Sequence, residues 1–74
     1  MNEKERVYFE RRTNYKPRKI KILYGESEEE IHYSASAIRN LAKDALDGAI
    51  SPNEAKKEIS NLLNIIKELN KKQI

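Results

Sequence analysis

The chain has 74 residues, of which 38% are hydrophobic and 36% charged, and it contains no Cys and no Trp. This length predicts one small soluble domain, and the missing Cys excludes disulfides, thiolate metal sites and Cys nucleophiles. Because His32 is the single His, we also expect no metal site, no cofactor and no enzymatic activity.

The N-terminal part predicts extended structure. In RKIKILY, residues 18–24, basic and apolar side chains alternate with the period of a β-strand. The segment RVYFER, residues 6–11, is a weaker strand candidate, and residues 13–17 would form the turn of a β-hairpin between the two. A short helix over residues 3–11 fits the residue propensities nearly as well, so both alternatives stay open.

A long helix is expected next. Ser27 and Glu30 have the spacing of a capping box, and Gly48 is a natural helix stop. The alternative is a strand over residues 30–35, with the helix beginning only at Ser36. The apolar stripe of the long helix consists of Ile31, Ala35, Ile38, Leu41, Ala42, Ala45 and Leu46.

The last predicted element is a helix over residues 52–72. Ser51, Pro52 and Glu54 form the pattern of an N-cap, a first-turn proline and a capping-box partner. The short connection over residues 47–51 predicts that the two helices fold back as an antiparallel hairpin. The apolar stripe of this second helix consists of Ala55, Ile59, Leu62, Leu63, Ile66 and Leu69.

Two such helices cannot cover both stripes alone, so we expect the N-terminal segment or a second copy of the chain to act as a lid. The predicted fold is therefore mainly α, or α+β if the hairpin forms, in a homo-oligomer such as a dimer. The residues expected in the core or in the self-association surface are Ile31, Ile38, Leu41, Ala45, Ile59, Leu62, Leu63, Ile66 and Leu69.

Charge is distributed unevenly along the chain. The formal net charge is +3, and residues 1–25 hold eight basic and three acidic residues, whereas residues 26–58 hold four basic and eight acidic ones. Basic residues interleaved with aromatic ones are typical of surfaces that bind nucleic acid or phosphorylated ligands. The alternative is that the Lys residues protect an edge strand from aggregation. The candidate binding residues are Arg11, Arg12, Tyr15, Lys16, Arg18, Lys19 and Lys21.

Other motifs are less informative. The turn near Gly48 does not fit a DNA-binding helix-turn-helix, because Asp44 and Glu54 stand where that motif needs a small and an apolar residue. The acidic residues between positions 26 and 30 are explained by the helix dipole, which favours negative charge at a helix N-terminus, and they need no binding role. The segment MNEKER is followed by no long apolar run, so we expect no signal peptide, no membrane association and a cytoplasmic location.

The composition resembles that of proteins from low-GC Gram-positive bacteria and their phages, with ten Lys, nine Ile and seven Asn. We expect a small non-catalytic binding protein, a regulator or inhibitor of the phage or bacterial accessory type. It would act through a protein partner, with Tyr8, Phe9 or Tyr15 contributing to the contact. The alternatives are a nucleic-acid- or nucleotide-binding protein and a structural subunit of a larger assembly.

Overall fold

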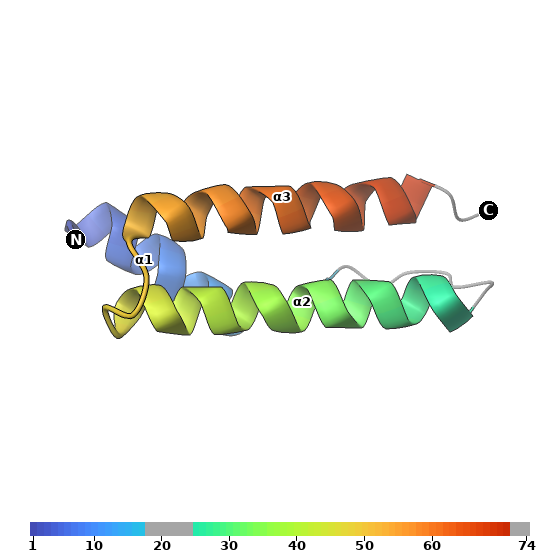
Figure 1. Ribbon diagram of the computed structural model, residues 1–74, viewed down its shortest axis with the longest axis horizontal. Helices are drawn as coiled ribbons and strands as arrows, with labels where there is room; N and C mark the ends of the chain where they lie inside the picture. The colour runs from blue at the N-terminus through green and yellow to red at the C-terminus, as the bar shows by residue number, and fades with distance from the viewer. Residues whose placement is uncertain (18–24, 72–74) are drawn as a thin grey trace.

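The structure, a computed structural model, describes residues 1–17 and 25–71, with side chains described from residue 29 in the second range. These ranges contain three helices and no strand: α1 (Glu3–Arg12), α2 (Gly25–Leu46) and α3 (Pro52–Lys71). The helices α2 and α3 run antiparallel, side by side, and α1 lies across them near the turn that joins them (Figure 1). The predicted mainly α fold and its helical hairpin are confirmed.

Helix α1 replaces the predicted β-hairpin. The Asn2 side chain accepts a hydrogen bond from Glu5 N at 2.8 Å, and the Glu5 carboxylate accepts one from Asn2 N at 3.3 Å. This capping box satisfies two amides that a helix start otherwise leaves unpaired. The strand interpretation of residues 6–11 is therefore wrong and the helical alternative is right. The predicted strand over residues 18–24 lies outside the described residues.

Helix α2 is continuous through residues 30–35, so the strand alternative for that segment is wrong. A strand would place Ile31 and Tyr33 on the same side of the backbone, but Ile31 is buried and Tyr33 is exposed. The period of a helix explains both positions. The helix begins at Gly25, two residues before the predicted cap Ser27, whose side chain lies outside the described part.

The turn after α2 is fixed by Gly48, whose φ of +80° is a conformation that L side chains rarely adopt. Gly48 N donates to Ala45 O at 3.2 Å, and Ala49 N donates to Asp44 O at 2.8 Å. This pair of bonds is a Schellman motif, which satisfies carbonyl groups at the end of α2. The predicted helix stop at Gly48 is confirmed.

Helix α3 begins as predicted. Ser51 Oγ accepts a hydrogen bond from Glu54 N at 3.2 Å, and the helix runs over Pro52–Lys71. The predicted last residue, 72, lies outside the described residues. Ile50, just before this cap, is half-buried against the core. The turn is therefore fixed by the Schellman motif at the end of α2 and by the Ser51 cap at the start of α3.

The core combines one aromatic residue from α1 with the small and branched residues of the hairpin. Of the nine residues predicted for the core or self-association, five are buried, and Leu41, Leu62, Leu63 and Leu69 are half-buried against them. Phe9 was not among those nine, and it is completely buried. The buried apolar residues are Phe9, Ile31, Ala35, Ile38, Ala42, Ala45, Ala55, Ile59 and Ile66.

The hairpin has two unequal sides, which we call the covered face and the open face. The covered face is the side on which α1 packs, behind the hairpin in Figure 1. The open face is the other side, where Tyr33, Ala37 and Leu41 of α2 lie beside Leu62 and Ile65 of α3. Helix α1 is thus the predicted lid, and it covers one side only.

Candidate functional site

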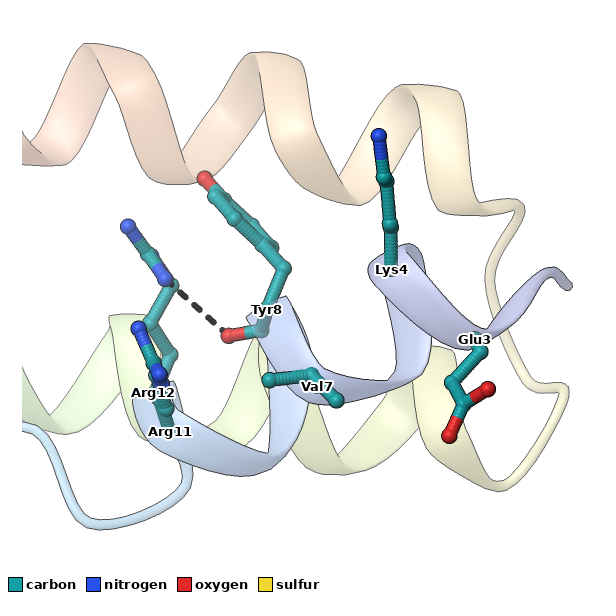
Figure 2. A pocket seen from close by; sticks show the side chains of 6 residues that line it. All are labelled: Glu3, Lys4, Val7, Tyr8, Arg11 and Arg12. Atoms are coloured by element: carbon teal, nitrogen blue, oxygen red, sulfur yellow. Dashed lines mark hydrogen bonds between the residues drawn. The ribbon is translucent and has the colours of Figure 1, made fainter.

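The covered face carries a basic groove along α1. Val7 lies in the groove with a partly exposed side chain, and Arg11 is exposed beside it. Three of the six lining residues are basic and one is acidic, so the groove suits an anion better than a cation. Figure 2 shows its lining residues, which are Glu3, Lys4, Val7, Tyr8, Arg11 and Arg12.

Arg12, one of the predicted binding residues, is already engaged within the protein. Its guanidinium carbon lies 3.5 Å from the centre of the Tyr8 ring, and Nη1 donates to Tyr8 O at 3.0 Å (Figure 2). A cation over an aromatic face is held by the ring quadrupole, and the hydrogen bond fixes the side chain further. Arg12 therefore stiffens the end of α1, whereas the exposed Arg11 keeps its charge available.

The aromatic residues of the N-terminal segment attach it to the hairpin. The rings of Tyr8 and Phe9 meet edge to face with centres 5.2 Å apart, and Phe9 is fully buried. Tyr15 is half-buried against the core, and its carbonyl oxygen accepts a hydrogen bond from Arg39 Nη1 at 2.8 Å. The prediction that Phe9 contacts a partner is wrong, because its whole surface is used inside the fold.

A second basic groove joins two segments that are far apart in the sequence. Tyr15 lines it together with Lys67 and Lys71 from the C-terminal half of α3, and Leu63 and Ile66 form its floor. Residues 59–74 carry three basic residues and one acidic residue. The fold therefore brings Lys67 and Lys71 to the covered face, where the basic residues of α1 also lie.

The predicted basic binding segment is thus divided between several places. Arg11 and Arg12 share the α1 groove, Tyr15 lines the other basic groove, and Lys16 is exposed. The remaining predicted residues lie outside the described part of the chain, and they are Arg18, Lys19 and Lys21.

One ion pair ties α1 to the hairpin. Lys56 Nζ lies 3.0 Å from Glu5 Oε2, and the Glu5 side chain is only 19% exposed. The hydrogen bond from Lys56 and the one from Asn2 N both favour the charged carboxylate and hold the pKa of Glu5 below its ordinary value. Glu5 therefore serves both as the cap of α1 and as its link to α3.

The open face holds the largest exposed apolar side chains of the hairpin. Tyr33 is 78% exposed and Ile65 46% exposed, and between them lies the half-buried Leu62. One hollow reaches from Glu30 to Ile65 and another runs alongside Leu41, and both are lined by Tyr33 and Leu62. The two hollows meet at these two shared residues, and we call them together the open groove between α2 and α3.

The rim of the open groove is acidic. Glu29 and Glu30 lie at the end near Ile65, and Asp44 and Glu58 lie at the end near the α2–α3 turn. The residues that line the groove include no Lys and no Arg. Among the described residues, basic side chains predominate in the grooves of the covered face and acidic ones in the open groove.

The sequence contains the signal for this open groove, although our sequence reasoning did not use it. Tyr33 and Ile65 both fall outside the apolar stripes of their predicted helices, on positions that a helix directs away from the stripe. Large apolar residues at such positions remain exposed unless another element covers them. An exposed pair of them from neighbouring helices indicates an interaction surface.

In the ranges 1–17 and 25–71, no group of three or more His, Asp or Glu side chains could hold a metal ion. No helix in these ranges combines the length and the apolar character needed to cross a membrane. Comparisons with models of known protein families, with curated proteins and with solved structures found no match to this chain. Its function is therefore inferred from the two faces described above.

Proposed function

We propose that the chain is a non-catalytic binding protein that acts on a protein partner through the open groove. A regulator or inhibitor of this kind needs one exposed surface with apolar anchors and a rigid scaffold behind it. The hairpin with its α1 lid supplies the scaffold.

The observation that carries this proposal is the exposure of Tyr33 and Ile65 over the half-buried Leu62 and Leu41. Tyr is among the residues that contribute most to binding energy at protein interfaces, because it combines a large apolar ring with a hydrogen-bonding hydroxyl. Neither side chain is needed to fill the core. The position of the anchors on adjacent helices favours one partner surface that touches both.

The basic segment is a less suitable surface for a protein partner than the sequence suggests. Its aromatic residues Phe9 and Tyr15 pack into the fold, and Arg12 is held over Tyr8. We therefore move the predicted contact from the N-terminal segment to the open groove. Self-association stays a prediction.

Site-specific photo-crosslinking in the source cell tests the proposal. A photoreactive phenylalanine analogue is placed at Tyr33, at the exposed control position Asn64 and at Arg11 in the basic groove. We expect one discrete crosslinked protein from position 33 and none from position 64. A product from position 11 alone, or none from position 33, would refute the open groove as the binding surface.

A second candidate function is nucleic-acid binding by the covered face. It is favoured by the gathering of Tyr15 with Lys67 and Lys71, beside the Lys4 and Arg11 groove on α1. Neutralised phosphates release counterions, so such binding weakens steeply with salt. For a nucleic-acid binder, the Lys67→Ala, Lys71→Ala double variant would leave a heparin column at lower salt than the parent, and it would flatten the salt dependence by about two units.

A further inference from the structure

We infer that the occupant of the open groove is a basic amphipathic helix of the partner protein. This inference rests on the proposed function and adds the chemistry of the partner to it. Two features of the groove carry it, the apolar floor between α2 and α3 and the acidic rim at both ends.

The apolar floor suits a helix. The seam between α2 and α3 is lined by Leu41 and Leu62, with Tyr33 and Ile65 standing above it. A helix that lies along such a seam buries side chains at i, i+3, i+4 and i+7 and keeps its other side in water. The partner helix would pack on the open face of the hairpin, as α1 packs on the covered face.

The acidic rim selects the charge of that helix. Glu29 and Glu30 at one end, and Asp44 and Glu58 at the other, would face the flanks of a helix in the groove. Lys or Arg on those flanks would pair with them, whereas Asp or Glu would be repelled. Charges at the rim of an interface act mainly on specificity and on the association rate.

The length of the groove sets the length of the occupant. Its lining along α2 extends from Glu29 to Asp44, and at about 1.5 Å per residue this corresponds to about 22 Å. A partner helix of about 15 residues would span it from rim to rim. A second copy of this chain fits less well, because its open face would bring a second acidic rim against the first.

The experiment uses three 15-residue peptides and the full chain labelled with ¹⁵N. The first peptide is built of Leu and Lys, with Leu at helical stripe positions. The second carries Glu in place of Lys, and the third has the composition of the first in an order without a stripe. Affinity is measured by calorimetry, and the binding surface is mapped by the amide shifts of the chain.

We expect the Leu–Lys peptide to bind, with the largest shifts around Tyr33 and Ile65. The double variant Asp44→Lys, Glu58→Lys should bind it about tenfold more weakly, because both charges at one end of the groove are reversed. The control Asp47→Lys, Glu68→Lys makes the same change in net charge at exposed positions outside the groove and should keep the parent affinity. The Tyr33→Ala, Ile65→Ala variant should lose about tenfold or more.

Any one of five outcomes would overturn the inference. The Leu–Glu peptide or the peptide without a stripe could bind as tightly as the first, the two charge variants could weaken binding equally, or the peptide could shift residues of the covered face. Shifts at Tyr33 and Ile65 that grow with protein concentration, without peptide, would assign the groove to a second copy. The proposed function fails separately, when position 33 yields no crosslinked protein in the cell.

Discussion

Large apolar side chains have different roles on the two faces of the hairpin, since they hold α1 on the covered face and stay exposed on the open face. On the covered face, Phe9 is completely buried and Arg12 lies over the Tyr8 ring, so aromatic and basic residues hold α1 in place. On the open face, Tyr33 and Ile65 stay exposed and nothing in the described fold packs over them. The difference shows that residue type alone does not separate scaffold from contact surface in a chain this small. What separates them is the position of the residue relative to α1.

This comparison separates stability from binding. Removing a buried side chain from beneath α1 should destabilise the protein, whereas removing an exposed one from the open face should leave it folded and remove only its binding.

Phe9→Ala should lower the free energy of unfolding by about 3 to 5 kcal/mol, because it opens a cavity beneath α1. A loss of this size is comparable with the whole stability of a small domain. Circular dichroism during urea unfolding measures it. The control Val7→Ala changes an exposed side chain on the same helix and should cost little. Equal midpoints for these two variants would mean that α1 does not cover the hairpin.

Ile66→Ala and Ile65→Ala form the sharpest matched pair, since the same change is made at adjacent positions. Ile66 is buried and Ile65 is 46% exposed. We expect a loss of about 2 to 5 kcal/mol for the first and of less than about 1 kcal/mol for the second. Thermal unfolding of both variants measures the difference. A larger loss for Ile65→Ala than for Ile66→Ala would mean that Ile65, and not Ile66, faces the core.

Gly48→Ala tests the turn that aligns the two faces. A Cβ at this position would meet no atom within 4 Å, so the cost comes from the positive φ alone. We expect a loss of about 1 to 2 kcal/mol, and Gly48→Asn should lose less because Asn tolerates this conformation better. An unchanged melting temperature for Gly48→Ala would contradict the Schellman turn.

Glu5→Gln gives the smallest effect and a dependence on pH. Because the Lys56 and Asn2 hydrogen bonds lower the folded-state pKa of Glu5, the carboxylate stabilises the fold above its unfolded-state pKa. This stabilisation is lost as the pH falls through the folded-state pKa. The variant should melt below the parent near pH 7, and the gap should narrow as the pH falls below the ordinary Glu pKa of 4.5. A gap that is constant with pH would show that the Glu5–Lys56 pair does not form.

Much of the hairpin could be predicted from the sequence, because its helices carry long apolar stripes and clear end signals such as Gly48 and Ser51. Helix α1 was harder, since it is short, highly charged and buries a single residue, Phe9. Its formation depends on tertiary packing, which the residue pattern of ten positions does not contain. Two local signals indicated it, the helix propensity of residues 3–11 and the capping-box spacing of Asn2 and Glu5, of which our prediction used only the first.

The candidate site was only partly predictable for the same reason. A helical pattern shows which residues share a side, but it does not show which side the lid covers. Tyr8, Phe9 and Tyr15 therefore resembled partner-contact residues in the sequence, although in the fold they pack the N-terminal segment against the hairpin. Tyr33 and Ile65 were not predicted as contact residues, because each lies off the stripe from which the core was predicted.

Cysteine labelling tests the central division between the faces most directly, because the chain has no Cys of its own. Ala42→Cys places one thiol in the buried covered side of α2, and Tyr33→Cys places one on the open face. Each purified variant reacts with a maleimide under native conditions at several protein concentrations. We predict rapid labelling at position 33 that does not change with concentration, and strong protection at position 42. Equal rates, or protection at position 33 in the isolated protein, would contradict an open face that is free to bind a partner.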